Sequence, residues 1–265
     1  MTVALIAVLT VVAGGVGTLT GFGTSTIMVP ALVMFFPLPE TLLLVGIIHW
    51  FGDVWKIWLF KRGIRWKLWL AFGITGVLYS YWGAMLSVSA PEDLMKRILG
   101  GVLVAYVVFL FTKQSFELPA TTGMAGIGGA ASGFMAGIFG VGGAVRGAFL
   151  AAFDLKKAVY IATSGAIAIV IDTARIGEYI HGGTRLAPEL LWGMLLFIPA
   201  SFVGAELAKG IVERIPQEKY AHRRKQYTFP IHTGQNADGM GHGVQHYNDT
   251  IVLLAHFYDT LTENL

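Results

Sequence analysis

The sequence contains no cysteine and unusually little charge. Without cysteine the chain can form neither a disulfide framework nor a thiolate metal site. Charged residues make up 13% of the chain, whereas soluble domains carry about 25%. The formal net charge is only +3 and the basic residues are scattered, so nucleic-acid binding has no electrostatic support. We therefore expect a protein of the lipid bilayer with no cofactor, no metal ion and no nucleic-acid partner.

Charge is absent altogether from two long apolar segments, Met1–Pro39 and Leu118–Val145. As one helix, the first would be roughly 58 Å long, nearly twice the bilayer's hydrocarbon core of about 30 Å. Both segments carry glycines near the middle, where a helix is most easily interrupted. We expect each to form a helical hairpin or a broken helix. Since no basic residue precedes the first segment, we expect it to stay in the membrane and not to be a cleaved signal peptide.

Five further apolar segments are long enough to cross a membrane as helices. They are Thr41–Phe60, Trp66–Val88, Leu94–Phe111, Ala158–Ile176 and Leu186–Leu207. The fold class that we expect is therefore all-α, a polytopic membrane protein.

The order of segments repeats along the chain, which indicates a duplication. The corresponding pairs are Gly23–Pro30 with Gly140–Gly147, Asp53 and Lys56 with Asp172 and Arg175, and Gly83–Leu86 with Gly204–Leu207. We expect a first membrane repeat over residues 1–112 and a second over residues 118–218. Each repeat would hold one glycine-broken hairpin and about three transmembrane helices.

The basic residues predict how the two repeats are oriented. If the second glycine-rich segment is a hairpin, most of the 19 Lys and Arg fall on one side of the membrane. The positive-inside rule makes that side cytoplasmic and gives the two repeats opposite orientations. Inverted repeats are typical of secondary transporters. We expect a multi-pass protein of the cell inner membrane.

The second repeat lacks the last helix that the first repeat has. After Pro216 the chain continues into a polar segment, residues 219–265, where the first repeat has Leu94–Phe111. This segment is either a cytoplasmic extension or a non-native end that replaces a lost helix. Its His242 and His246 have a spacing that suits a metal ion, but we favour a solvated tail.

Two glycine-rich motifs resemble those of a known family. Gly21-Phe-Gly-Thr-Ser-Thr-Ile-Met-Val-Pro30 and Gly137-Ile-Phe-Gly-Val-Gly-Gly-Ala-Val-Arg146 are similar to the paired motif of the TauE/SafE family of sulfite exporters. The resemblance covers about Val3 to Glu218. The motifs depart from the family pattern at Thr24-Ser25 and at Gly147. The resemblance implies a secondary transporter, not an enzyme, that moves sulfite, sulfonates or related anions by proton coupling or by the membrane potential.

An interrupted helix offers donors to an anion that has lost its water. The first turn of a helix has amide groups without partners and the positive end of the helix dipole. Glycine lets the backbone approach a ligand closely, and a buried arginine is a planar partner for an oxyanion. The predicted substrate-binding residues are Gly21, Gly23, Thr24, Ser25, Gly140, Gly142, Gly143 and Arg146. The other reading is that glycines serve helix packing, which we expect for Gly100 and Gly101.

Two further pairs are candidates for coupling or gating, with protons as the coupling ion. His49 and Asp53 share a helix face, as do Asp172 and Arg175. Each pair also fits a purely structural hydrogen bond or ion pair. Lys56 is interpreted only as part of a cytoplasmic loop.

Two other functions were considered. A membrane-embedded hydrolase would need Ser132 as nucleophile, but no histidine precedes His181 in the same repeat. A scaffold that transports nothing would need neither a buried charge nor broken helices. Arg146 and the two overlong segments therefore favour a transporter.

Overall fold

The computed structural model describes residues 2–21, 23–60, 63–112 and 118–214, and the secondary structure of this part is entirely helical. The helices are α1 (Thr2–Thr20), α2 (Ser25–Leu32), α3 (Leu38–Phe60), α4 (Trp66–Ser89), α5 (Glu92–Thr112), α6 (Thr122–Phe139), α7 (Gly142–Ala151), α8 (Lys157–His181) and α9 (Pro188–Arg214). Six of them, α1, α3, α4, α6, α8 and α9, are long and apolar enough to cross a membrane. The prediction of an all-α, multi-pass membrane protein is confirmed.

The five predicted spans correspond to α3, α4, α5, α8 and α9. The helices extend beyond the predicted ends, most of all α9, which continues to Arg214. The predicted tail, residues 219–265, lies outside the described residues, and so do His242 and His246.

The first glycine-rich segment is a helical hairpin. Gly21 and Gly23 both have φ +80°, a conformation that side chains with a Cβ disfavour, and α2 begins two residues after Gly23. The short arm α2 then folds back along α1. The Thr10 hydroxyl of α1 accordingly lies 3.9 Å from the Met28 sulfur of α2. The break predicted from the excessive length of Met1–Pro39 is therefore confirmed.

The second glycine-rich segment is also a hairpin. Gly140, with φ +73°, ends α6 in the left-handed conformation common at helix C-termini. A Cβ on Gly142 would collide with the backbone of Ser132, and a Cβ on Gly128 would collide with Phe149. The arm α7 thus runs back against α6, as α2 does against α1.

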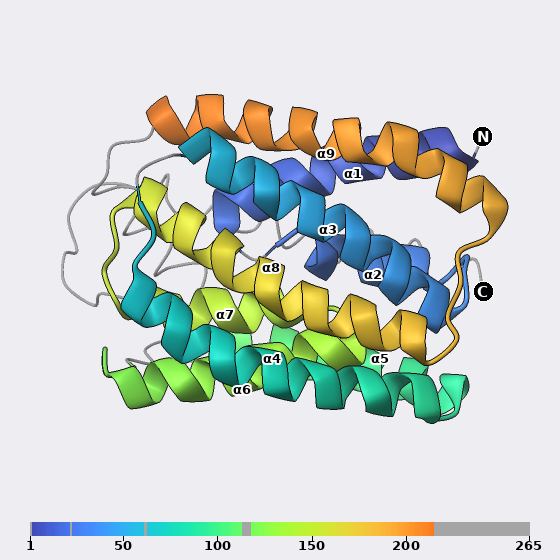
Figure 1. The fold of residues 1–265 in the computed structure, drawn as a ribbon, viewed down its shortest axis with the longest axis horizontal. Coiled ribbons are helices and arrows are strands. Elements are labelled where there is room, and N and C mark those ends of the chain that lie inside the picture. The colour runs from blue at the N-terminus through green and yellow to red at the C-terminus, as the bar shows by residue number, and fades with distance from the viewer. Residues whose placement is uncertain (1, 22, 61–62, 113–117, 215–265) are drawn as a thin grey trace. The chain divides into compact units, whose positions relative to one another are not determined.

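The long helices form three groups (Figure 1). The long helices α3 and α8 pack against each other at the centre, with α1 and α9 on one side and α4 and α6 on the other. These pairings join one half to the other, and exchanging the halves turns each pairing into its counterpart. Thus α1 packs on α9 as α6 packs on α4, and α3 packs on α9 as α8 packs on α4. This pattern agrees with the predicted duplication, and the opposite orientation of the halves stays a prediction.

Glycines bring the outer helices into backbone contact. On α6, a Cβ on Gly133 would collide with the Gly76 carbonyl oxygen of α4. On α9, a Cβ on Gly204 would lie 2.5 Å from the Val11 carbonyl oxygen of α1. Small residues at such contacts are what membrane helices use to approach each other. The expectation of close packing is wrong for Gly100 and Gly101, because nothing described lies within 4 Å of a Cβ built at either.

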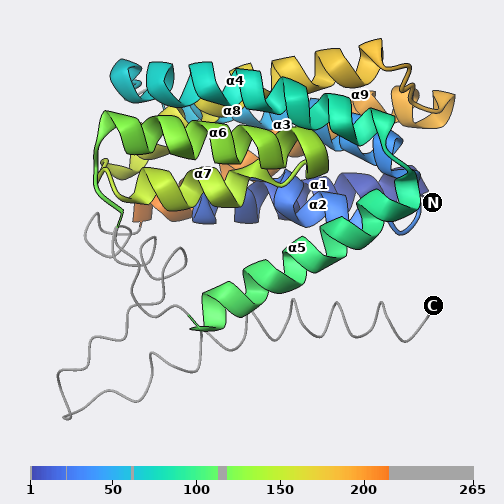
Figure 2. The same cartoon turned by 90° about the horizontal axis from the view of Figure 1, so that it is seen from below.

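The helix α5 contacts the bundle only through its first turns. Met95 and Leu99 are buried in the core, and α5 then diverges from the other helices (Figure 2). At its start, Glu92 accepts a hydrogen bond from the Leu38 N–H of α3 at 2.9 Å. The hydrogen bond with Lys96, and to a lesser degree that from Leu38, lowers the pKa of Glu92. Glu92 thereby ties the start of α5 to the start of α3.

Candidate anion site

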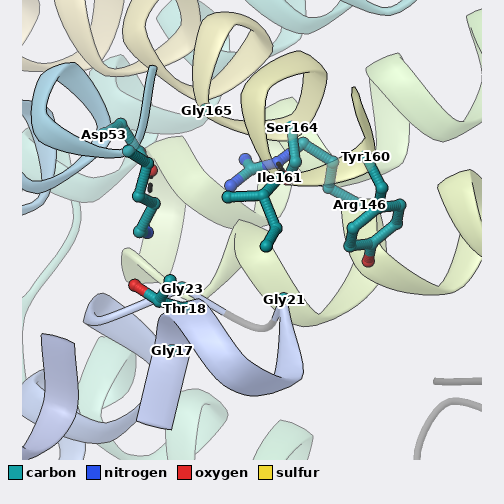
Figure 3. Close-up of a pocket in the computed structure, with 11 residues that line it drawn as sticks. Gly17, Thr18, Gly21, Gly23, Asp53, Arg146, Tyr160, Ile161, Ser164 and Gly165 are labelled. Atoms are coloured by element: carbon teal, nitrogen blue, oxygen red, sulfur yellow. Dashed lines mark hydrogen bonds and ion pairs between the residues drawn. The ribbon is translucent and has the colours of Figure 1, made fainter. Parts of the chain in front are cut away.

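A narrow cavity lies where the first hairpin meets α3, α7 and α8 (Figure 3). It contains the break of the hairpin and residues from each of these helices. Its lining consists of Gly17, Thr18, Gly21, Gly23, Asp53, Lys56, Arg146, Tyr160, Ile161, Ser164 and Gly165. Three glycines leave the backbone of the hairpin facing the cavity, and two cationic side chains lie on the helices around it.

Arg146 is a buried cation without a carboxylate partner. Only 3% of it is exposed, and its Nε donates a hydrogen bond to the Ser164 hydroxyl at 3.1 Å. Within the described part of the chain, no carboxylate lies within ion-pairing distance of it. The guanidinium therefore brings an uncompensated positive charge to the cavity wall.

Lys56 also belongs to the cavity, which corrects the interpretation of it as a loop residue. It lies within α3 and is 5% exposed, and its Nζ forms an ion pair with Asp53 Oδ1 at 2.8 Å. The pairing neutralises the ammonium but leaves it among the residues that line the cavity. A lysine buried inside a membrane protein is almost always paired in this way.

The predicted glycines of the first break lie at this cavity. A Cβ on Gly21 would lie 2.6 Å from the Tyr160 hydroxyl, and one on Gly23 would lie 2.7 Å from His49 Nε2. Thr24 and Ser25 are buried beside the break but are not among the cavity-lining residues. The structure thus brings Gly21, Gly23 and Arg146 together.

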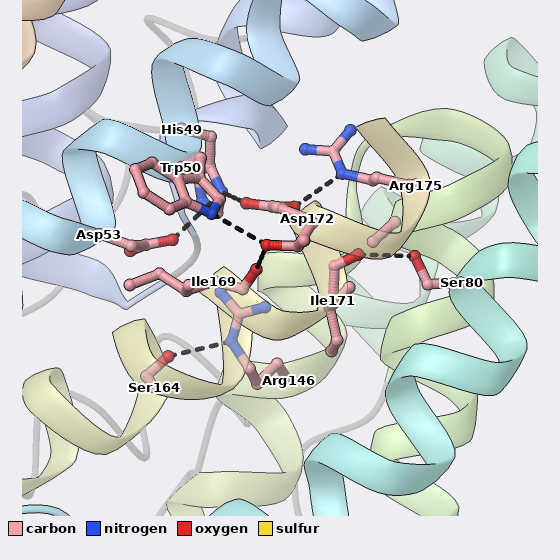
Figure 4. A network of polar contacts seen from close by, with 12 residues as sticks. His49, Trp50, Asp53, Ser80, Arg146, Ser164, Ile169, Ile171, Asp172 and Arg175 are labelled. Carbon is pink, nitrogen blue, oxygen red and sulfur yellow. Dashed lines mark hydrogen bonds and ion pairs between the residues drawn. The ribbon is translucent and has the colours of Figure 1, made fainter. Parts of the chain in front are cut away.

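A buried network of charged side chains adjoins the cavity (Figure 4). His49 Nδ1 lies 2.6 Å from Asp172 Oδ2 and 3.2 Å from Asp53 Oδ2. Each carboxylate also has a cation three residues further along its own helix, with Lys56 beside Asp53 and Arg175 Nε 2.7 Å from Asp172 Oδ1. The imidazole of α3 therefore links the central helices of the two halves, and Asp53 belongs to both the network and the cavity.

Three polar atoms of the network have no hydrogen-bond partner: His49 Nε2, Asp53 Oδ2 and Arg175 Nη1. Asp53 Oδ2 is within ion-pair distance of His49, but the His49 Nδ1 hydrogen bond goes to Asp172, so the contact with Asp53 is electrostatic. Incomplete pairing of buried charges is costly. Buried charges with incomplete pairing are therefore expected mainly at sites where charges move during function.

The second break is not part of this cavity. Gly140, Gly142 and Gly143 are absent from its lining, and only Arg146 of their helix reaches it. Gly140 faces Arg175 instead, because a Cβ on Gly140 would lie 3.5 Å from Arg175 Nη1. Gly142 packs against α6. The predicted substrate residues are thus divided between two places in the fold.

A chain with two glycine-broken hairpins around buried cations can now be compared with known protein families. The family model described as "Sulfite exporter TauE/SafE" matches residues 6–224. The chain belongs to the TauE/SafE sulfite exporter family. No curated protein and no solved structure matches it. Family membership indicates a membrane transporter of anions, which agrees with the resemblance seen in the two motifs.

One cluster of this TauE/SafE protein has atoms close enough to share a metal ion. The ligand atoms of His49, Asp53 and Asp172 lie within 4.8 Å of one another. Both carboxylates are already paired with Lys56 and Arg175. A metal ion would compete with these two fixed cations, so the cluster suits a proton better than a metal.

Ser132, the candidate nucleophile of a hydrolase, is buried at the contact between α6 and α7. Its hydroxyl donates to the Gly129 carbonyl oxygen of its own helix at 3.2 Å. It is not among the residues that line the cavity. Its position therefore supports a packing role within the TauE/SafE fold.

Seven residues of the cavity lining were not among the predicted site residues: Gly17, Thr18, Lys56, Tyr160, Ile161, Ser164 and Gly165. Lys56 was detectable, because it stands three residues after Asp53 as Arg175 stands after Asp172. Tyr160 and Ser164 lie one helical turn apart on α8, a spacing that by itself does not distinguish a site from packing.

Proposed function

We propose that this protein is a secondary transporter of the cell inner membrane that carries a small oxyanion, of the sulfite or sulfonate class, by alternating access. Arg146 holds the anion in the cavity, Lys56 assists it, and His49 carries the coupling proton.

The single observation that supports this most is the unpaired charge of Arg146. A charged side chain in the middle of a membrane protein costs several kcal/mol unless a partner compensates it. Among the residues that the structure describes, the one polar contact of Arg146 is with the Ser164 hydroxyl, which is a neutral acceptor. A bound oxyanion would supply the missing negative charge, and the planar guanidinium matches two of its oxygens.

Neighbouring groups favour a small and polar ligand. The Thr18 and Tyr160 side chains and the exposed backbone of Gly17 and Gly21 surround the same space. In this structure the Thr18 hydroxyl donates to the Gly14 carbonyl oxygen at 2.8 Å and the Tyr160 hydroxyl to the Gly147 carbonyl oxygen at 3.4 Å, so each would turn from that carbonyl to donate to an anion. The cavity is too narrow for a bulky solute, because glycine at three positions is what opens it.

The network beside the cavity supplies a route for coupling. An anion that draws the Lys56 ammonium toward itself weakens the Lys56–Asp53 pair, and Asp53 then attracts a proton on His49 more strongly. The same imidazole contacts Asp172 at 2.6 Å, so its charge acts on both central helices. Binding of an anion and of a proton would therefore favour each other.

Alternating access is supported by the pairing of the helices. Both halves contribute a hairpin, a central helix and an outer helix, and the outer helix of each half packs on the hairpin and the central helix of the other. Transporters built from inverted repeats bind their substrate where broken helices of the two halves meet. In this protein the short arms of the two hairpins, α2 and α7, contact each other.

The test is a flux assay with the purified full chain in proteoliposomes. Sulfite, taurine, sulfate and phosphate are offered to the wild type, to Arg146→Gln and to the control Arg185→Gln. Arg185 is exposed and bonds only to backbone carbonyl groups near its own helix end. Arg146→Gln should slow transport of the preferred anion about tenfold or more, the loss of one charged hydrogen bond. Arg185→Gln should stay within about twofold of the wild type.

Two results would contradict the proposal. If the wild type moves none of the four anions faster than protein-free vesicles, the transport function is wrong. If the wild type transports and Arg146→Gln is equally fast, Arg146 does not hold the substrate.

A further inference from the structure

A second buried guanidinium lies beside the break of the α6–α7 hairpin. Arg175 is fully buried, its Nε pairs with Asp172 at 2.7 Å, and its guanidinium also interacts with the Tyr179 side chain. Its Nη1 has no hydrogen-bond partner. This nitrogen points at the break, since a Cβ on Gly140 would lie 3.5 Å from it. Figure 4 shows the guanidinium extending away from Asp172.

A second glycine lies beside this guanidinium. A Cβ on Gly46 of α3 would lie 3.5 Å from both Cζ and Nη1 of Arg175. Apolar side chains lie on the Gly140 side, because the Cβ position of Gly140 lies 2.9 Å from Val29 Cγ2 and 3.0 Å from Leu42 Cδ2, and Tyr179 is a polar neighbour of the guanidinium. The group is therefore enclosed, with a donor that no protein atom accepts.

The surroundings of Arg175 repeat those of the cavity. Asp53 and Lys56 form an ion pair as Asp172 and Arg175 do. Gly46 precedes Asp53 by as many residues as Gly165 precedes Asp172. Gly165 is one of the residues that line the cavity.

The breaks of the two hairpins also correspond. Gly23 and Gly140, at matching places in the duplicated motif, both have positive φ. One copy of the arrangement is thus an open cavity and the other is closed.

We propose that Arg175 and the first turn of α7 form a second subsite for the transported oxyanion. The inference rests on the proposed transport function and adds to it. The Nη1 donor of Arg175 binds the anion from one side, and the amides of Gly142 and Gly143 at the N-terminus of α7, a helix of ten residues, bind it from the other. The subsite opens when the α6–α7 hairpin separates from α3.

The two subsites would be occupied in turn. When the cavity at Arg146 is open, as here, Val29 and Leu42 close the space beside Arg175. His49 contacts the carboxylate of each ion pair. Its proton therefore acts on both subsites, and the anion passes from one cation to the other across the pair of central helices.

The first test uses Arg175→Lys, which keeps the charge and can pair with Asp172 as Lys56 pairs with Asp53. It removes the donor fork that the second subsite needs. Sulfite transport is measured from each face separately, in vesicles that hold the protein in one orientation. The half-saturating sulfite concentration should rise about tenfold on one face and stay within about twofold on the other. Arg185→Lys is the control and should change neither face.

A second pair of variants guards against loss of folding in Arg175→Lys. Gly46→Ala adds a Cβ beside Arg175, and the atoms nearest to that Cβ would be side-chain atoms, Ile176 Cγ1 at 3.2 Å and Arg175 Cζ and Nη1 at 3.5 Å. It should weaken sulfite on the same face as Arg175→Lys. Gly165→Ala, the matched substitution at the cavity, should weaken sulfite on the opposite face.

The outcomes separate the two claims. If the wild type carries none of sulfite, taurine, sulfate and phosphate, the proposed function fails and the subsite with it. If the wild type carries sulfite but Arg175→Lys and Gly46→Ala leave both faces unchanged, the second subsite is refuted and the proposed function stands. If Arg175→Lys does not fold, the result for Gly46→Ala decides.

Discussion

Arg146 and Arg175 show two ways of burying a guanidinium in a helical membrane protein. Arg175 is compensated by Asp172, whereas Arg146 has only a serine hydroxyl. Placing an arginine at the centre of a membrane costs at least about 2.5 kcal/mol. The difference in pairing is why we assign the resting anion site to Arg146.

At the residue scale, Gly23 is a position where alanine should affect function. Its φ of +80° costs alanine about 1–2 kcal/mol, and the added Cβ would lie 2.7 Å from His49 Nε2. We expect Gly23→Ala to lower both thermal stability in detergent and sulfite flux. The matched control is Gly183→Ala, with φ +91° and no described atom within 4 Å of its Cβ. It should lose similar stability and keep its flux. Equal flux in the two variants would show that the His49 contact is irrelevant.

Some of the site was predictable from single residues and some was not. A lone arginine in an apolar segment predicted the burial of Arg146, and helical spacing predicted the Asp172–Arg175 pair. The contact between His49 and Asp172 spans 123 residues along the chain. It depends on how α3 packs on α8, and nothing in either segment alone specifies that packing. Lys56 was misassigned because a lysine near a basic loop usually belongs to that loop.

At the element scale, the contact between α4 and α6 depends on glycine. A Cβ on Gly133 would collide with the Gly76 backbone, which cannot rotate away as a side chain can. We expect Gly133→Ala to destabilise the protein by about 1–3 kcal/mol, as overpacking does. Gly100→Ala, where the Cβ meets no described atom, should be neutral or slightly stabilising. Thermal unfolding in detergent measures both. Equal midpoints for the two variants would contradict the assigned contact.

The elements themselves were largely predictable, since length against bilayer thickness is a strong physical constraint. Segments of about 20 apolar residues became single helices, and the two overlong segments became hairpins broken at glycine. The sequence did not distinguish glycines that pack from glycines that face lipid or open space. Gly133 and Gly100 both lie within helices, and only the neighbouring helix decides the role of each.

At the scale of the whole molecule, the two halves have matching helix pairings but different states of their charged sites. A small cavity lies at Arg146, whereas Val29 and Leu42 pack against Gly140 beside Arg175. The boundaries of the repeats, residues 1–112 and 118–218, and their opposite orientation stay predictions. Under the proposed alternating access, the two sites would differ in this way at one stage of the cycle.

The measurement that tests the account most directly is sulfite accumulation in proteoliposomes under an imposed pH gradient, compared between the wild type and His49→Gln. We expect the wild type to accumulate sulfite only with the gradient. His49→Gln should exchange internal for external sulfite but fail to accumulate it, because the group that carries the proton is gone. The account is contradicted if the wild type accumulates no sulfite, or if His49→Gln accumulates as much as the wild type.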